Sequence, residues 1–277
     1  MASQGLAGWT SKPAPAYYYQ SIHFPTDTIG YAVGFDYLTQ GAIAKTTDGG
    51  ENWIAQPSGT TNPLYGVHFP RDANTGYVVG NNGTIRKTTN GGANWSNLNS
   101  NVTDHLRGVH FPSASVGYVV GWGARILWTT NGGSSWVPMT VGNQDLYGVY
   151  FVNNSVGYVV GDNGTILKTT TGALSWSSQS SGTTQGLEKV HFPVDTTTGY
   201  AVGWGGTILK TTNGGTNWVA QASGTAQDLL SVHFPADNGT GYAVGANGTI
   251  LKTTDGGVNW FLQVSGTSSS MVSVHFP

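Results

Sequence analysis

Several residue types are absent or scarce in this chain of 277 residues, and each absence excludes a class of protein. It has no cysteine, which excludes disulfides, thiolate metal sites, iron–sulfur clusters and cysteine nucleophiles. Charged residues make up only 9%, and 11 Lys+Arg against 13 Asp+Glu leave too little positive charge for a nucleic-acid surface. No apolar run approaches the length of about 18 residues that a transmembrane helix needs.

Glycine and aromatic residues are abundant instead. The chain contains 42 Gly together with 10 Trp, 13 Tyr and 9 Phe. This aromatic content and a formal net charge of only −2 argue against disorder, and the chain is long enough to bury a large core. We therefore predict a folded protein in which glycine serves turns and close packing.

The sequence is built from a repeat of about 42 residues. A phrase typified by Val-His-Phe-Pro occurs seven times, with successive copies 40 to 45 residues apart. The phrases Gly-Tyr-(Ala/Val)-Val-Gly and Gly-Thr-Ile-Leu-Lys-Thr-Thr-(Asp/Asn)-Gly-Gly-x-Asn-Trp each recur six times, with variations. The seven copies of the first phrase cover residues 22–25, 67–70, 109–112, 149–152, 190–193, 232–235 and 274–277.

Each repeat predicts four short β-strands, denoted A to D. In the second repeat they cover residues 64–69, 76–79 and 84–88, and strand D starts near Trp95. Asn82-Gly83 supplies the positive φ values of a tight B–C hairpin. The pattern predicts an all-β fold, a β-propeller of four-stranded antiparallel blades, with six blades favoured and seven as the alternative. A parallel β-helix is the competing interpretation, but its rungs are shorter and it does not use Asn-Gly hairpins.

The turn before strand D resembles the Asp-box, (Ser/Thr)-x-Asp-x-Gly-x-x-Trp, of sialidase-type (BNR) propellers. The hydroxyl position is Thr46 in the first copy and Thr253 in the last, and Thr171 replaces the acidic residue in the fourth. The resemblance implies a folding device, in which a short side chain satisfies backbone donors while tryptophan packs into the blade. The structural residues are then Asp48, Asn90, Asn131, Asn213 and Asp255, with Trp53, Trp95, Trp136, Trp176, Trp218 and Trp260.

Taken whole, the repeat is similar to those of photosystem II assembly-factor-like propellers, which also occur in many secreted bacterial proteins. The resemblance covers nearly the whole chain and implies the propeller fold. The plant and cyanobacterial members are associated with a basic patch that meets a membrane-protein client. Here the four arginines lie in different blades and at different repeat positions, so we take the fold from the resemblance and not the client. They are Arg71, Arg86, Arg107 and Arg125.

Two recurring polar positions invite a functional interpretation. The second position of the Val-His-Phe-Pro phrase is histidine in six of seven copies, but Tyr150 in the fourth, and tyrosine replaces a neutral imidazole ligand poorly. We interpret this series as a flat polar ring that packs between blades and donates a hydrogen bond, and we predict no metal and no cofactor. The strand-C lysines are interpreted as stems packed beside aromatic residues, because Trp128 replaces one of them. The two series are His23, His68, His110, His191, His233 and His275, and Lys45, Lys87, Lys168, Lys210 and Lys252.

No set of residues predicts catalysis. A sialidase needs several arginines around one carboxylate and a tyrosine activated by glutamate, whereas this chain has only Glu51 and Glu188. A two-carboxylate glycoside hydrolase is a remote alternative that would draw on loop aspartates, which we interpret as turn residues. We therefore predict that the protein is not an enzyme. The loop aspartates are Asp36, Asp104, Asp145, Asp162 and Asp228.

Departures from the repeat indicate a binding surface. The B–C hairpins and D–A loops are expected on one face of the ring, called here the hairpin face. There, Trp122 and Trp204 replace the usual Asn or Asp, and the first hairpin is enlarged to residues 35–40, which include Phe35 and Tyr37. Exposed aromatic side chains offer platforms for sugars or proteins. We predict ligand or partner binding at these four residues, although packing onto adjacent loops is an alternative.

The ends do not match a simple ring. We treat residues 1–277 as one propeller domain with six full repeats, an extra D-like strand at 8–13 and an extra A-like strand at 271–277. Either segment 271–276 closes the first blade and displaces 17–24, or 17–24 keeps its place and the C-terminal strand is free. An unpaired strand favours strand exchange, hence a homo-oligomer or filament. Alternatively, the chain is part of a longer seven-bladed protein.

The predicted function is a non-catalytic protein-interaction or assembly module that self-associates through a surplus terminal strand. The alternative is a multivalent, lectin-like propeller that binds carbohydrate, since similar blades favour avidity. A protein or glycan partner is expected, and no nucleic acid. The resemblance to secreted proteins implies an extracellular or cell-surface location, although residues 1–4 show no signal peptide and a cytoplasmic location stays open.

Overall fold

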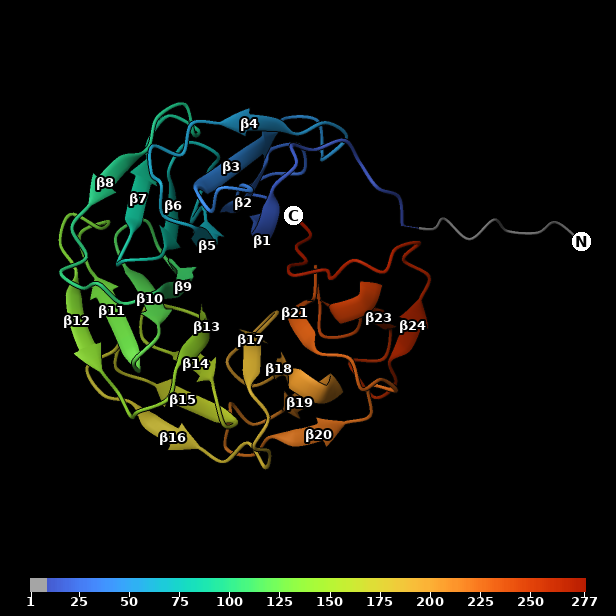
Figure 1. Cartoon of the computed structure of the whole chain (residues 1–277). Coiled ribbons are helices and arrows are strands. Elements are labelled where there is room, and N and C mark those ends of the chain that lie inside the picture. The colour runs from blue at the N-terminus through green and yellow to red at the C-terminus, as the bar shows by residue number, and fades with distance from the viewer. Residues whose placement is uncertain (1–8) are drawn as a thin grey trace, which may run out of the picture.

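The computed structural model describes residues 9–277 and contains six antiparallel sheets, each formed by four consecutive strands and arranged in a ring (Figure 1). The prediction of an all-β propeller with four-stranded blades is confirmed, and six blades are complete. The strands are β1–β4 (Tyr18–His23, Gly30–Phe35, Gly41–Thr46, Ile54–Gln56), β5–β8 (Leu64–His68, Gly76–Gly80, Ile85–Thr88, Ser96–Leu98), β9–β12 (Leu106–His110, Gly117–Gly121, Arg125–Thr129, Val137–Thr140), β13–β16 (Leu146–Phe151, Gly157–Gly161, Thr165–Thr169, Ser177–Gln179), β17–β20 (Leu187–His191, Gly199–Gly203, Thr207–Thr211, Val219–Gln221) and β21–β24 (Leu229–His233, Gly241–Gly245, Ile250–Thr253, Phe261–Gln263).

The only helical turns among the described residues are two 3₁₀ turns inside B–C hairpins, η1 (Trp204–Gly206) and η2 (Ala246–Gly248). No helix in residues 9–277 has the length and hydropathy that a membrane crossing requires. The hairpin turns follow from local chemistry: Asn82 and Gly83 adopt φ values of 53° and 65°, which Asn and Gly tolerate best. Tyr77 in β6 then lies opposite Lys87 in β7.

Neighbouring blades are joined by one repeated aromatic stack. The strand-B tyrosine of one blade lies on the strand-A phenylalanine of the next; Tyr77 and Phe111 have ring centroids 3.8 Å apart. Glycine precedes that tyrosine because the phenylalanine of its own blade covers it: a Cβ on Gly76 would lie 2.3 Å from the Phe69 ring. Between the six complete blades, these stacks bury five tyrosines to 0–1% exposure, namely Tyr31, Tyr77, Tyr118, Tyr158 and Tyr200.

The strand-C lysines add a charged contact to the same interface. Lys87 donates to the carbonyl oxygen of Gly132 in the next blade at 2.8 Å and lies 5.3 Å from the centre of the Tyr77 ring. The Tyr77 hydroxyl donates to the same oxygen. The ammonium charge therefore does more than our stem-packing interpretation allowed, because it binds a carbonyl across the interface. Equivalent bonds join Lys45 to Gly91, Lys168 to Gly214 and Lys210 to Gly256.

Segment 271–277 lies between β21 and β1, beside the central axis (Figure 1). The Val274 amide donates to Ser231, and the Ile22 amide donates to Ser273, both at 3.2 Å. Strand β1 keeps its place in the first blade, as one of the two predicted arrangements requires. The C-terminal segment lies at a seventh position on the axis and contacts β1 and β21 through serine hydroxyls. Neither of the two predicted extra strands is formed: residues 9–13 and 271–277 contain no β-strand, and residue 8 lies outside the described residues. No B and C strands lie between these two segments in the described part of the chain.

Candidate functional site

The central channel is lined by seven strand-A segments. Its end nearer the A–B loops carries the histidine ring, whose neighbouring aromatic centroids lie 4.5–5.1 Å apart and close the circle through His275 and His23. This ring consists of His23, His68, His110, Tyr150, His191, His233 and His275. Seven packed aromatic side chains fill this part of the channel, and the residual cavity has a volume of about 240 Å³.

The histidines accept hydrogen bonds where we predicted that they donate. The amide of Phe111 donates to Nδ1 of His68, and that of Phe151 donates to Nδ1 of His110, both at 3.3 Å. An imidazole that accepts at Nδ1 is neutral, with its proton on Nε2. Burial is the main cause that lowers the pKa of His110 to about 3, and the positive charge of Lys189 lowers it further. Among residues 9–277, no three His, Asp or Glu side chains are placed to share a metal ion.

The opposite end of the channel, on the hairpin face, is lined by side chains of different chemical types. One residue from each strand-A segment, three positions before the histidine ring, surrounds a cavity of about 250 Å³. We call this set the mouth ring: Gln20, Tyr65, Arg107, Tyr147, Glu188, Leu230 and Val272. The same strands that repeat histidine at one end therefore present apolar, aromatic, amide, acidic and basic side chains at the other.

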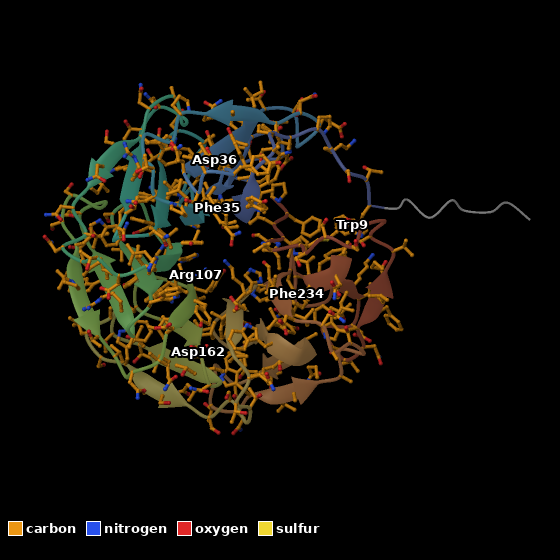
Figure 2. The ribbon with its side chains drawn as sticks, viewed as in Figure 1. Trp9, Phe35, Asp36, Arg107, Asp162 and Phe234 are labelled. Carbon is orange, nitrogen blue, oxygen red and sulfur yellow. The ribbon has the colours of Figure 1, made fainter. Side chains whose placement is uncertain are left out.

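Arg107 is the cation of the mouth ring and points towards the centre of the propeller (Figure 2). Its guanidinium carbon lies 4.8 Å from the centre of the Tyr65 ring and 5.6 Å from that of Tyr147. Its Nη2 is 4.0 Å from Glu188 Oε2. Within the described chain the guanidinium forms no direct hydrogen bond, so two aromatic faces position a planar donor group that is still free to bind a carboxylate.

Acidic side chains around Arg107 are held in place. Glu188 Oε1 accepts from the indole nitrogen of Trp204 at 2.8 Å, and the Tyr147 hydroxyl donates to Asp162 at 2.8 Å. Burial raises the pKa of Glu188, against the opposing effects of Trp204 and Arg107. Burial also raises the pKa of Tyr147, and its bond to Asp162 raises it further. The mouth thus combines fixed acceptors with one fixed cation.

Lys189 lies one residue deeper than Glu188 and lines the channel between the mouth ring and the histidine ring. The protein atoms packed around it lower its pKa. The equivalent residues of the neighbouring segments, such as Gly148 and Ser231, are uncharged, so Lys189 is another departure from the repeat. A cation at this depth favours an acceptor or a negative charge that enters from the mouth.

The four aromatic residues predicted as a binding surface occupy three separate blades. Trp122 is 42% exposed and packs on His105, with the two ring centroids 4.3 Å apart. Trp204 is 38% exposed and lies beside Tyr147 at the mouth. Phe35 and Tyr37 instead meet through Tyr18 in the first blade, with centroid distances of 5.4 and 5.6 Å. The structure brings Trp204 to the mouth ring and leaves the other three in two further patches.

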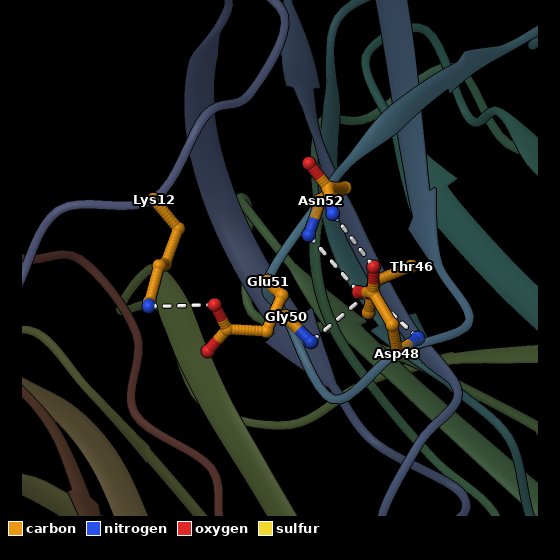
Figure 3. Close-up of polar contacts among 6 residues, drawn as sticks. All are labelled: Lys12, Thr46, Asp48, Gly50, Glu51 and Asn52. Atoms are coloured by element: carbon orange, nitrogen blue, oxygen red, sulfur yellow. Dashed lines mark hydrogen bonds and ion pairs between the residues drawn. The ribbon is translucent and has the colours of Figure 1, made fainter.

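The turns before strand D form a polar network of their own (Figure 3). The Thr46 hydroxyl accepts from the Gly50 amide at 3.0 Å, while Asp48 accepts from the backbone and side-chain amides of Asn52, both at 2.9 Å. These Asn52 bonds, followed by that from Thr46, lower the pKa of Asp48 to about 2. Asn90, Asn131 and Asn213 accept the corresponding backbone bonds. The turn residues are therefore occupied with backbone donors.

Our sequence reasoning missed most of the mouth ring. Arg107 and Glu188 were noted only as isolated charges, and Tyr65 only as part of a strand. A signal was available, because the position two residues before the Val-His-Phe-Pro phrase differs between copies, with only tyrosine occurring twice, whereas the phrase itself is nearly constant. What the repeat alone does not show is that the seven variable positions face one another across a channel.

The chain resembles one family and several solved propellers. A family model described as "Photosynthesis system II assembly factor YCF48" matches residues 58–146 and 139–222. Similar structures include YCF48 bound to a D1 peptide (TM-score 0.74, 18% identity, covering 93% of this chain and 84% of that one) and YCF48 from Cyanidioschyzon merolae (0.75, 20%, 95% and 90%). The WD40 propeller domain of Doa1 is also similar (0.73, 13%, 94% and 86%). No protein of curated function matches the sequence.

Proposed function

Because the chain belongs to the family of the photosynthesis system II assembly factor YCF48, we propose that it is a non-catalytic protein-interaction module that binds an extended polypeptide segment over the channel mouth. The observation that carries the proposal is Arg107, held between Tyr65 and Tyr147 with no hydrogen bond from its guanidinium to any of residues 9–277. A peptide carboxylate would accept from this guanidinium. A relative described as bound to a D1 peptide supports a polypeptide as the ligand class.

The rest of the mouth suits a peptide in chemistry. Glu188 offers an acceptor for backbone amides or a lysine, and the exposed part of Trp204 offers an apolar platform. Leu230 and Val272 complete an apolar arc on the other side of the mouth. A cation, an anion and apolar surface around one opening give a peptide several distinct contacts, and the unequal mouth residues favour one ligand orientation.

Catalysis is not part of the proposal. The carboxylates nearest the mouth are already hydrogen-bonded, Glu188 to Trp204 and Asp162 to Tyr147. Fixed carboxylates of this kind serve recognition by presenting acceptors in one geometry. Hydrolysis by two carboxylates would instead require an acid and a base free to face a common bond.

The experiment is a peptide array that carries random peptides and D1-derived peptides, probed with the protein and with two matched variants. We expect Arg107→Gln to abolish binding of carboxylate-containing peptides, and Arg71→Gln to leave it unchanged, because Arg71 is an exposed residue of an A–B loop at the other end of the ring. Equal peptide binding by both variants would contradict the proposal, as would turnover of the bound peptides.

Carbohydrate binding is the competing prediction, and Trp122 and Trp204 are its candidate platforms. Both indoles already contact protein, Trp122 through His105 and Trp204 through Glu188, which leaves only part of each ring for a sugar. A glycan array probed with a Trp122→Ala/Trp204→Ala double variant separates the two ligand classes. Glycan signals that disappear in this variant and persist in Arg107→Gln would favour a lectin.

A further inference from the structure

A seventh position of the ring holds the two ends of the described chain, and residues 9–277 contribute no B and C strands to it. Its strand-A place is taken by segment 271–277: the Phe276 amide donates to Nδ1 of His233, and the Phe24 amide donates to Nδ1 of His275. These are the same contacts that successive strand-A segments make elsewhere in the ring, such as that of Phe111 with His68. At the axis the circle is therefore closed by seven units.

Trp9 occupies the outer part of the same position, between the first and last blades (Figure 2). Its ring lies 6.3 Å from Phe276 in an edge contact, as Trp260 lies 6.1 Å from Phe234 within the sixth blade. It also lies 5.9 Å from Tyr242. Trp9 and Phe276 thus stand where a blade has its strand-D tryptophan and its strand-A phenylalanine, but the two middle strands between such residues are not supplied by residues 9–277.

In the two blades next to the seventh position, residues that normally contact an adjacent blade lack their partners. In the first blade, Phe24 is half-buried, whereas the corresponding Phe69, Phe111, Phe151, Phe192 and Phe234 are 1–3% exposed under a tyrosine of the preceding blade. In the last blade, Tyr242 is half-buried, and within the described residues its hydroxyl and the Lys252 ammonium have no carbonyl to donate to. The other complete interfaces supply such partners, as with Lys210 and Gly256.

A groove of about 920 Å³ marks this position, and more of its lining is apolar than polar. Phe24, Gly49 and Gly50 line it from the first blade, and Trp9 and Ser273 line it from the two end segments. Gly49 corresponds to Gly91, whose carbonyl accepts from Lys45 of the preceding blade. The groove therefore presents the surface against which a preceding blade normally packs its strand-B tyrosine and strand-C lysine.

From these contacts we infer that the groove is a docking site for one β-hairpin of defined chemistry: a Gly-Tyr-(Ala/Val)-Val-Gly strand, an Asn-Gly turn and a Thr-Ile-Leu-Lys-Thr-Thr strand followed by an Asp-Gly-Gly turn. Its tyrosine stacks on Phe24, and its lysine donates to the Gly49 carbonyl. Its terminal glycines give Tyr242 and Lys252 their acceptor. Its first strand pairs with segment 271–277 by strand addition, which adds backbone hydrogen bonds to the side-chain fit.

The chain itself provides the probe, a synthetic peptide of residues 241–257 with the sequence GYAVGANGTILKTTDGG. We expect 1:1 binding to the 277-residue protein in calorimetric titration, with a dissociation constant on the order of 1–100 µM after the cost of ordering the hairpin. Binding to the folded state also raises the unfolding temperature of the protein. A scrambled peptide controls for non-specific contact with exposed strand edges.

Variant peptides test the contacts without changing the fold of the protein. Tyr242→Ala or Lys252→Ala in the peptide should weaken binding at least about tenfold, the loss of a buried stack or a charged hydrogen bond, whereas Ala246→Ser at the hairpin tip should not. In the protein, Trp9→Ala should weaken binding and Arg107→Gln should not, which keeps this test independent of the channel mouth. No binding at about 0.5 mM peptide, well above the expected range, overturns the inference. A dimer in light scattering that saturating peptide does not dissociate also overturns it, because the groove is then filled by a second copy.

Discussion

The two ends of the central channel are built by the same seven strand-A segments, yet they differ in almost every respect. At one end the segments share one kind of residue, and six histidines and one tyrosine pack against one another in a closed circle, most of them with tilted rings. At the other end, three residues earlier, no single side-chain type dominates, and Arg107 stands between two tyrosines opposite Glu188. Agreement between repeats indicates packing that every blade needs, and disagreement indicates surface that is free to recognise a ligand.

Acidification should destabilise the fold through the histidine ring, and we expect this change to have the largest effect on stability. Buried neutral histidines have folded-state pKa values well below the unfolded value of about 6.5; those of His191 and His275 are about 3 and 4. The unfolded chain therefore binds more protons, and stability falls as pH decreases through 6.5 towards 4. The slope reaches up to about 1.4 kcal/mol per pH unit for each such histidine. Urea unfolding at pH 7.5 and 5.0 measures it.

The control for acidification is His68→Tyr, because Tyr150 shows that the ring accepts a phenol at this place. This variant should lose less stability between pH 7.5 and 5.0 than the wild type, since one proton fewer is taken up on unfolding. The aspartates of the turns titrate below this window, as the pKa of about 2 for Asp48 indicates. A pH-independent stability above pH 5 would show that the ring is not buried as described.

A second test extends the comparison to the blade interfaces. The strand-B tyrosine is buried between two complete blades in most copies, but in the last blade it faces the groove and is only half-buried. Tyr158 is 0% exposed, stacks 4.0 Å from Phe192 and donates to Gly214. Tyr158→Ala should reduce the free energy of unfolding by about 3–5 kcal/mol. Tyr242→Ala should cost about 1–2 kcal/mol, because part of this ring is already in water. Chemical denaturation of both variants measures the two losses in the free energy of unfolding. Equal losses would contradict the description of the seventh position as incomplete.

The third prediction sharpens the comparison at the channel mouth. Arg107→Gln should change the free energy of unfolding by less than about 1 kcal/mol, since the guanidinium is partly exposed and its ion pair with Glu188 is long, at 4.0 Å. Peptide binding in the array should nevertheless be lost. A residue with a small stability effect and a large binding effect is a recognition residue; a loss of several kcal/mol in denaturation would instead assign Arg107 to the packing of the ring.

The smallest effect is expected in the turns before strand D. Asn213 accepts the backbone amide of Asn217 at 2.9 Å, as Asp255 accepts that of Asn259. Asp255→Asn should therefore leave the unfolding temperature at pH 7 nearly unchanged. It should also remove part of the acid sensitivity below about pH 4. The hydrogen bonds that lower the pKa of Asp255 stabilise the fold only while its carboxylate is charged, and Asn has no charge to lose. Thermal unfolding at pH 7 and 3 measures both effects.

The blade was predictable because its information is local. Asn82-Gly83 sets the B–C turn, and the residues of high β-propensity in 76–79 and 84–88 predict strands that match the observed β6 and β7. The direction of the histidine hydrogen bond was not predictable in this way. It depends on the position of a backbone amide in the next blade, which is 43 residues away for His68 and Phe111.

The sequence by itself determined the strands, their order within a blade and the hairpin turns, because the β-propensity of short segments and the turn residues between them specify these features. Only the tertiary structure decided how many units surround the axis and which side chains meet there. The angle between blades depends on the summed packing of Tyr–Phe stacks and lysine contacts across each interface, and no short segment encodes that sum. Closure around seven places gathers Tyr65, Arg107, Tyr147 and Glu188 at one mouth and leaves the groove beside Trp9.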